Sequence, residues 1–410
     1  MRVLIVTQYF WPENFRINQI VESLVDRGVD VEVLTGKPNY PEGKIFQGYR
    51  TCGCQTEQWK GALVHRVPLI PRGRNSAFGL LSNYISFIFF GLVSGSWLLR
   101  KRQYDVIFVY GLSPILLAIP GLLLGWLKNI NVIIWIQDLW PESLSATGFV
   151  RNNIIISAVR QVVSWIYRSA DLLLVQSRAF DKPVRALTAK TPIIYYPNSV
   201  DDSFTTIAKS LPPDVPGLGD GFSVMFAGNI GVAQGVSVIV EAALLLKGYA
   251  DIHFVVLGDG SSREWMLKES RQHGLTNLHL PGRFPMETMP AFMQKASALL
   301  VTLADQAIFA VTVPNKVQAY LATGRPIIAC LNGEGARLVV EAEAGLACPA
   351  GDARALADAV LYLYKLSPNE REIIGVNGRR YYQKHFNHEY LVDELIGHLR
   401  AMSKHRKDFA

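Results

Sequence analysis

The sequence has few charged residues and few cysteines. Asp, Glu, Lys and Arg make up 18% of its 410 residues, half of the residues are hydrophobic, and the mean hydropathy is +0.18. This composition excludes a disordered or coiled-coil chain. The length predicts two or three domains, each able to bury its own core. The excess of apolar residues is unusual for a purely soluble protein and requires a local explanation.

The four cysteines, Cys52, Cys54, Cys330 and Cys348, form no C-x-x-C pair, and no ligand set at zinc spacing surrounds them. We therefore predict free thiols in a reducing cytosol and no metal site. The first residues, MRVLIVT, become polar too soon for a signal peptide and predict a buried first strand.

The sequence also lacks the common catalytic motifs: it contains no G-x-S-x-G elbow, no Walker loop and no H-E-x-x-H helix. The net charge of +7 and the isoelectric point of about 9.1 fit nucleic acid, an anionic membrane or phosphate-bearing substrates. Because the basic residues are spread out and not clustered with stacking aromatics, no nucleic-acid partner is predicted.

One segment, residues 77–99, contains no charge and is long enough to span a bilayer. Basic residues flank both of its ends, which leaves no charge asymmetry to orient a span. Small and polar residues lie roughly on one helical face, as expected of a helix that rests on a surface. The flanking cations are Arg72, Arg74, Arg100, Lys101 and Arg102. We predict a membrane-associating helix; a buried core helix and a true span remain open.

Short apolar runs alternate with longer helical patterns along the whole chain. Near-continuous β-branched runs are typical of parallel strands covered on both faces. In the first half the runs are Val3–Val6, Val29–Leu34, Val106–Val109, Val132–Ile136 and Leu172–Val175. In the second half they are Val224–Phe226, Phe254–Leu257, Leu278–Leu280, Leu299–Leu303, Ile327–Ala329 and Leu346–Cys348. The pattern predicts an α/β fold of two Rossmann-like domains whose parallel sheets face a central cleft.

A stretch rich in proline and glycine, residues 211–220, interrupts this rhythm. We predict an N-terminal domain at 1–205, a linker at 206–220 and a C-terminal domain at 221–385. In the last segment, 386–410, leucines at 391, 395 and 399 indicate an amphipathic helix that returns to the N-terminal domain.

Glycine-rich loops follow three strands of the predicted C-terminal domain. Glycines let a backbone approach a ligand closely, and the N–H groups of a following helix start can face an anion. The spacing is not that of a dinucleotide fingerprint, and plain turns or an exposed arginine are the alternatives. The candidates are Gly228, Asn229, Gly231, Gln234, Gly235, Asp259, Gly260, Arg283 and Phe284.

Lys316 lies in the first turn of a predicted short helix, after Pro314 and Asn315 and before the stop signal at Gly324. A cation at that position is unfavourable for the helix dipole unless an anionic ligand binds there. The position therefore predicts a phosphate contact.

The predicted N-terminal domain has its own candidates at strand ends. Asp138 follows a buried strand and could act as a base or hold a hydroxyl, although the segment also fits a turn in which Pro141 starts a helix. Aromatic residues with interspersed charges after the first two strands fit sugar binding as well as loop packing. The further candidates here are Glu13, Arg16, Asn39, Tyr40, Gln137 and Glu142.

Eight segments in this order resemble the glycosyltransferases of family 4, and more narrowly the bacterial surface-polysaccharide branch that includes N-acetyl-L-fucosamine and colanic-acid-type transferases. The segments are TQYFWPE (7–13), TGKPNYP (35–41), IQDLWPES (136–143), YYPNSVD (195–201), FAGNIGVAQG (226–235), VLGDG (256–260), VPNKVQAYLATGRPIIA (313–329) and NGEGARLVVEAEAGLACPAGD (332–352). The resemblance implies the GT-B fold.

It also implies retaining, metal-independent transfer of a sugar, such as N-acetyl-L-fucosamine, from a UDP-sugar to a polyprenyl-diphosphate-linked acceptor. The C-terminal domain would hold the donor through backbone amides and cations, with no cofactor, and the N-terminal domain would hold the acceptor. Asp138 and Lys316 would be the catalytic residues. Such an enzyme would lie on the inner face of the cytoplasmic membrane and build O-antigen, exopolysaccharide or capsule.

The chain departs from the wider family at several positions. Asn229 and Gln234 stand where the family often has Arg and Lys, and Gln137 stands where it often has His. The two glutamates that usually grip sugar and ribose hydroxyls would fall at Val311 and Ala319.

Glu334 is the candidate to take over part of the glutamates' role. Two other functions remain open at this point: a sugar-nucleotide epimerase of the same fold, and a non-catalytic nucleotide-sugar-binding protein, which the missing glutamates would favour.

Overall fold

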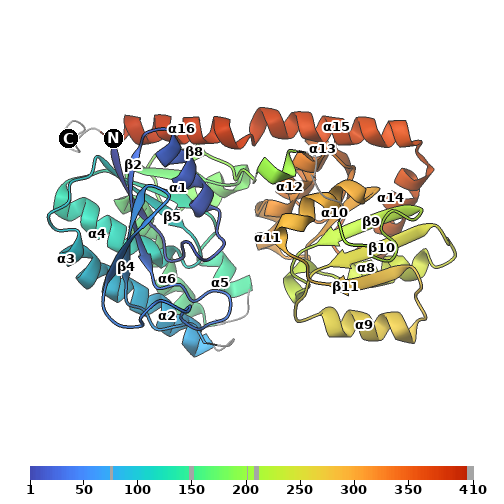
Figure 1. Ribbon diagram of the computed structural model, residues 1–410, viewed down its shortest axis with the longest axis horizontal. Coiled ribbons are helices and arrows are strands. Elements are labelled where there is room, and N and C mark those ends of the chain that lie inside the picture. Colours follow the sequence, from blue (N-terminus) through green and yellow to red (C-terminus); the bar gives the residue numbers. More distant parts are fainter. Residues whose placement is uncertain (74–76, 147–151, 201, 207–211, 404–410) are drawn as a thin grey trace. The chain divides into compact units, whose positions relative to one another are not determined.

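The computed structural model describes residues 1–73, 77–146, 152–200, 202–206 and 212–403 (Figure 1). The chain forms two units, Met1–Pro197 with Glu389–Ala410, and Asn198–His388. Each unit is an α/β layered structure around one sheet, as the strand pattern predicts. We call them unit 1 and unit 2.

Unit 1 contains an eight-stranded sheet in the order β3-β4-β2-β1-β5-β6-β7-β8, in which only the β3–β4 pair is antiparallel. The strands are β1 (Arg2–Val6), β2 (Asp30–Gly36), β3 (Gln55–Trp59), β4 (Ala62–Val67), β5 (Val106–Gly111), β6 (Val132–Ile136), β7 (Leu172–Val175) and β8 (Ile193–Tyr195). The five predicted strands of this half are confirmed. The hairpin β3–β4 and the short β8 are strands that the apolar pattern does not reveal.

Helices cover both faces of this sheet. They are α1 (Ile17–Asp26), α2 (Ala77–Phe90), α3 (Ser96–Leu98), α4 (Ile119–Lys128), α5 (Glu142–Ala146), α6 (Asn153–Ser169), α7 (Asp181–Arg185) and α16 (His388–Ala401), with shorter turns at η1 (Gly91–Gly95), η2 (Ile115–Ala118) and η3 (Arg178–Phe180). Apolar residues of α1 and α16 share a core with alternate residues of the strands, and Leu391, Leu395 and Leu399 of α16 belong to it. Arg27, which directly follows α1, also donates to Asp393 at 2.7 Å. The C-terminal helix therefore packs on unit 1.

Unit 2 contains a six-stranded, fully parallel sheet in the order β11-β10-β9-β12-β13-β14. Its strands are β9 (Phe222–Ala227), β10 (Ile252–Leu257), β11 (Leu278–Gly282), β12 (Ala298–Thr302), β13 (Ile327–Cys330) and β14 (Gly345–Cys348). All six predicted strands of this half are confirmed.

Helices again cover both faces of the sheet of unit 2. They are α8 (Ser237–Leu245), α9 (Arg263–Gln272), α10 (Met289–Lys295), α11 (Ala307–Val311), α12 (Asn315–Thr323), α13 (Glu334–Glu341), α14 (Ala353–Lys365) and α15 (Pro368–His385), with turns at η4 (Asp202–Phe204), η5 (Val232–Gln234) and η6 (Met286–Thr288). Two apolar clusters form the core, one on each side of the strands.

The units divide between Pro197 and Asn198, ahead of the boundary that the composition places at 205. Of the stretch 206–220, interpreted above as a linker, residues 207–211 lie outside the described residues. Val215 and Leu218 are buried in the core of unit 2 beside Met225. Proline and glycine here shape a loop that enters unit 2.

The charge-free segment forms α2, a π-helical turn at η1, and α3. Among the described residues it is the one stretch, Phe78–Leu98, long and apolar enough to cross a bilayer by length and composition, a test that core helices also pass. Its polar and apolar faces are arranged opposite to those of an ordinary surface helix: Asn83 and Ser86 are buried against the protein, and large apolar side chains face outward. The exposed apolar residues are Phe78, Leu81, Ile85, Phe89, Val93 and Trp97.

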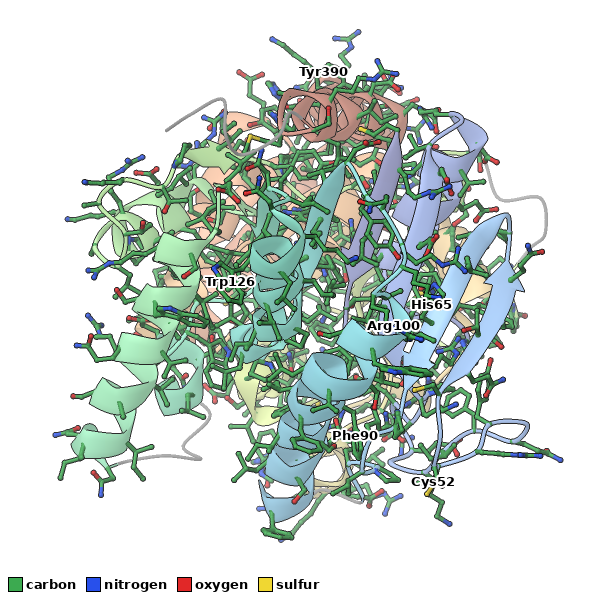
Figure 2. The ribbon with its side chains drawn as sticks, turned by 90° about the vertical axis from the view of Figure 1, so that its left-hand side faces the viewer. Cys52, His65, Phe90, Arg100, Trp126 and Tyr390 are labelled. Atoms are coloured by element: carbon green, nitrogen blue, oxygen red, sulfur yellow. The ribbon has the colours of Figure 1, made fainter. Side chains whose placement is uncertain are left out.

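The exposed residues of this segment recur every three or four positions and so share one side of the helix. A π-helical turn contains more residues than an α-helical turn, so successive side chains rotate less about the helix axis. The turn at η1 therefore keeps Val93 and Trp97 on the same side as the preceding apolar residues. Trp126, at the end of the neighbouring α4, is also exposed, and Figure 2 labels it together with Phe90 and Arg100. Lys128 donates to the backbone oxygen of Arg102 at 2.7 Å, which fixes the end of α4 beside the basic flank.

Candidate active site

Two glycine loops of unit 2 interlock at the carboxyl ends of β9 and β10. The N–H of Gly228 donates to the backbone oxygen of Leu257 at 2.9 Å, and the N–H of Ile230 donates to the backbone oxygen of Asp259 at 2.8 Å. A Cβ on Gly258, whose φ is +143°, would lie 1.8 Å from the oxygen of Gly228. The contact therefore requires glycine at 258, as only a residue without a Cβ fits.

Lys316 lies against the first of these loops. Its Nζ is 3.7 Å from the ring centroid of Phe226, and a Cβ on Gly228 would be 2.6 Å from its Cε. Nζ is buried and has no hydrogen-bond partner among the described residues. Burial lowers the pKa of Lys316 to about 7, because desolvation disfavours the ammonium and no counter-ion offsets it. An unpaired cation at the carboxyl end of a parallel sheet is arranged to receive an anion.

Asn229 and Gln234 stand where the wider family often has cations, and here they contact each other. Gln234 Oε1 accepts from Asn229 Nδ2 and from the N–H of Gly231, both at 3.2 Å. Thr302 Oγ1 donates to the backbone oxygen of Gln234 at 2.6 Å, and Gly235 closes the turn at a φ of +58°. These side chains hold the shape of the first glycine loop.

The remaining donor-side candidates differ in exposure. The N–H of Gly260 donates to Asp259 Oδ1 at 2.8 Å, which turns the second loop. Arg283 is exposed, whereas the ring of Phe284 packs 4.8 Å from that of Phe292. Phe284 thus packs against the core of unit 2 through Phe292.

Arg263 is a further cation near these loops that the motifs do not indicate. It is the first residue of α9. Its backbone N–H donates to the backbone oxygen of Gly260 at 3.1 Å, and its Nη2 donates to the backbone oxygen of Leu280 at 3.1 Å. The helix-dipole argument used for Lys316 would have found it, because Arg263 also lies in a first helical turn.

Glu334 begins α13 and forms a bidentate pair with Arg337, with the shortest contact at 2.9 Å. A Cβ on Gly335 would lie 3.1 Å from Pro314, so the starts of α12 and α13 are neighbours. Exposed Asn315 accepts from Asn198 Nδ2 at 3.1 Å.

The positions of the missing glutamates have ordinary structural surroundings. Val311 ends α11, and Ala319 is buried in the core on α12. The start of α13 thus brings Glu334 near the helix of Lys316, while the Glu334 carboxylate is paired within its own helix.

In unit 1, Glu13 joins the loops that follow β1 and β2. Its buried carboxylate accepts from the backbone N–H groups of Asn39 and Tyr40 at 2.7 Å, and from that of Phe10 at 3.2 Å. Burial raises the pKa of Glu13 to about 7. Glu13 is thus placed to position these loops, and its carboxylate is not exposed for a sugar.

The same loops carry a cluster of aromatic rings. Tyr9 and Phe15 stack at 5.1 Å, and Tyr40 packs against both at 5.7 and 5.2 Å. Tyr40 is 38% exposed, whereas Asn39 is fully buried. Arg16 immediately precedes α1 in the same loop. The exposed ring of Tyr40 is the part of this cluster that a ligand can reach.

Asp138 follows β6 and accepts a hydrogen bond from Ser143 of α5. Ser113 and the N–H of Leu139 also bond its carboxylate, and burial raises the pKa of Asp138. Both predicted features are present: α5 begins directly after Pro141, and the carboxylate lies at a strand end. Gln137 adjoins it, and Glu142 forms an ion pair with Arg160 at 3.0 Å.

In the described part of the chain, no three His, Cys, Asp or Glu side chains come together as a metal-binding group.

The two units correspond to two known sequence families. Residues 14–199 match the glycosyl transferase 4-like domain, and residues 221–365 match the glycosyl transferases group 1. The chain belongs to the family 4 glycosyltransferases. The family resemblance and the prediction of a transferase enzyme are thereby confirmed.

Relatives of this glycosyltransferase include the probable glycosyltransferase WbjE of Pseudomonas aeruginosa. It is 26% identical over 299 residues, which cover 71% of this chain and 73% of WbjE. The putative colanic acid biosynthesis glycosyl transferase WcaI of Escherichia coli is 26% identical over 345 residues, covering 79% and 82% of the two chains.

Similar solved structures confirm the GT-B fold. Sucrose-phosphate synthase from Thermosynechococcus elongatus has a TM-score of 0.75 at 17% identity, with 98% of both chains covered. HepE of Anabaena, in a complex with UDP and glucose, has a TM-score of 0.68 at 14% identity, with 98% of this chain and all of HepE covered.

Proposed function

We propose that this glycosyltransferase moves a sugar from a UDP-sugar to a lipid-linked saccharide during synthesis of a bacterial surface polysaccharide. The names of WbjE and WcaI support the pathway class, and the complex of HepE with UDP and glucose supports the donor class. N-acetylamino sugars such as N-acetyl-L-fucosamine are the first donors to test.

Lys316 is the observation that carries the proposal. A diphosphate beside the first glycine loop would supply the counter-ion that its buried Nζ lacks. The ammonium would then stabilise the negative charge that develops on the leaving UDP, a role that needs no metal ion.

Asp138 would hold the acceptor hydroxyl at the end of β6. In this scheme the acceptor oxygen bonds to the anomeric carbon on the face from which UDP leaves, so the configuration is retained without a protein nucleophile, and the leaving phosphate takes the acceptor proton. Catalysis would then depend mainly on positioning the two substrates.

The outward face of α2–α3 supports a peripheral position on the inner membrane surface. Its apolar side chains run from Phe78 to Trp97, and the guanidinium of Arg100 lies 4.1 Å from the ring centroid of Trp97. Exposed Trp126 and the cations at 100–102 add the aromatic and basic groups that bind anionic bilayer surfaces.

The activity is tested with membrane fractions that carry the lipid acceptor, incubated with a panel of nucleotide sugars. We expect UDP release and a glycosylated lipid with one donor, no turnover in Lys316→Met, and full turnover in the control Lys268→Met, an exposed lysine of α9. Activity that persists in EDTA would support a metal-independent reaction. UDP binding without turnover of any donor would instead indicate a nucleotide-sugar-binding protein, and conversion of the donor without transfer would indicate an epimerase.

Membrane docking is tested by flotation with anionic liposomes. Replacement of Phe89 and Trp97 by Ser should reduce binding strongly, and replacement of Arg100 and Lys101 by Gln should make it weaker and less salt-sensitive. Trp265→Ser, an exposed tryptophan of unit 2, is the control. Unchanged flotation of both variants would refute docking through this face.

A further inference from the structure

The segment 70–72 of unit 1 is a loop whose backbone is held on two sides. The N–H of Ile70 donates to Ser86 Oγ at 2.9 Å, and Asn83 Nδ2 donates to the oxygen of Ile70 at 2.6 Å. The N–H of Arg72 donates to Asn39 Oδ1 at 3.2 Å. Because Asn39 and Asn83 are fully buried, Arg72 has a fixed backbone position between α2 and the loop after β2.

The side chain of Arg72 lies at the exposed edge of the aromatic cluster. Its guanidinium carbon is 5.0 Å from the ring centroid of Tyr40. Within the described residues, no Asp or Glu forms an ion pair with it. The guanidinium is therefore held in place on a ring and still has its donors available.

The acidic groups of this region are occupied elsewhere. The carboxylate of Glu13 accepts from three backbone N–H groups, and that of Asp138 accepts from Ser143.

We propose that Arg72, together with the phenol of Tyr40, binds the diphosphate of the lipid-linked acceptor. The inference rests on the proposed function and assigns the acceptor's charged group to a subsite. The planar fork of a guanidinium matches two phosphate oxygens, and pairing is favourable for a cation that has no carboxylate partner.

The position of α2 explains why a lipid headgroup would reach this subsite. Asn83 lies on the side of α2 that faces the loops, whereas Leu81 and Ile85 are exposed on its outer face. If the outer face rests on the bilayer, the diphosphate at the bilayer surface lies beside the same helix.

The test compares two soluble acceptors that carry the same saccharide, one on a short prenyl diphosphate and one on a neutral alkyl group. The wild type should prefer the diphosphate. Arg72→Gln should raise KM for the diphosphate acceptor roughly 10- to 100-fold, as expected for lost charged hydrogen bonds. Its kcat, its KM for the alkyl acceptor and its affinity for UDP should not change. Arg72→Lys, which keeps the charge without the fork, should restore part of the preference.

Arg2→Gln is the matched control, because Arg2 pairs with Asp30 at the opposite, amino end of the same sheet. An Arg72→Gln enzyme that keeps the wild-type preference for the diphosphate would overturn the inference while the proposed function stands. A wild type that glycosylates neither acceptor and releases no UDP with the membrane acceptor would overturn the proposed function itself.

Discussion

The binding of a UDP-sugar should weaken steeply as the pH rises above 7, because the protonation of Lys316 limits it. Burial without a counter-ion lowers the pKa of this lysine from 10.5 to about 7. A shift of this size corresponds to about 5 kcal/mol against the ammonium. A diphosphate next to Nζ favours the ammonium, so its binding must be accompanied by proton uptake at alkaline pH.

The magnitude follows from the titration of the free protein. With a pKa of about 7, half of the molecules carry the ammonium at pH 7 and about one in a hundred at pH 9. The diphosphate of a UDP-sugar keeps its two charges over this range. The affinity should therefore fall roughly 50-fold between pH 7 and pH 9.

Isothermal titration calorimetry in two buffers of different ionisation enthalpy measures both the affinity and the protons taken up. The wild type should take up close to one proton at pH 9, and Lys316→Met should bind weakly with no proton uptake at any pH. Lys268→Met should behave as the wild type. An affinity of the wild type that is constant from pH 7 to 9, or a pH dependence that survives in Lys316→Met, would refute the reasoning.

Four further outcomes are expected. In the absence of ligand, the free energy of unfolding of the wild type should rise from pH 7 toward 10, because Lys316 is protonated in the unfolded state and mostly neutral in the folded state over that range. In thermal melts, Lys316→Met should not show this rise. Gly258→Ala should lower the free energy of unfolding by more than about 3 kcal/mol and abolish UDP binding, since a Cβ would overlap a backbone oxygen. Gly274→Ala, whose Cβ would make only an ordinary contact with Lys247 at 3.6 Å, should lower it by about 1 kcal/mol, and equal urea midpoints of the two variants would contradict this. Glu13→Gln should lower the free energy of unfolding by about 2–4 kcal/mol, because the amide of Gln would present its NH₂ group to one of the three N–H donors that the carboxylate now accepts from. A loss below about 0.5 kcal/mol in urea titrations would argue against this role. Asp138→Asn should lower turnover roughly 10²-fold, because the acceptor hydroxyl is then positioned less well. UDP affinity should not change, as Asp138 belongs to unit 1, and unchanged turnover would remove Asp138 from the reaction.

All eleven apolar runs interpreted as strands are strands in the structure, and most of them are buried on both faces. The strands that the pattern does not reveal lie at or next to the edges of the sheet of unit 1. β3 has the polar sequence QTEQW, β4 contains a buried His65 and Arg66 that interrupt its apolar run, and β8 is only three residues long. These polar groups are bonded by partners far along the chain, such as Glu32 for His65, which no local pattern can indicate.

The candidate site was predictable where a residue violates a local rule. Lys316 opposes the dipole of its own helix, and that conflict is visible in the order of residues alone. Glu13 is a different case, because its role depends on N–H groups of a loop 26 residues away. The local sequence of a polar residue between aromatic residues does not indicate whether its side chain faces a ligand or the interior of the protein.

The sequence by itself determined the α/β class and the order of the strands in the chain, and its ordered motifs carry the resemblance to the family. The class and the strand order follow from hydrophobic period, turn residues and glycines, which act over a few neighbouring positions. Only the tertiary structure decided that the apolar face of α2 is the exposed one, that Glu13 is buried, and that Arg72 lies on Tyr40 without an acidic partner among the described residues. Burial and charge pairing arise from contacts between distant segments, so they are properties of the fold and cannot be read from any one segment.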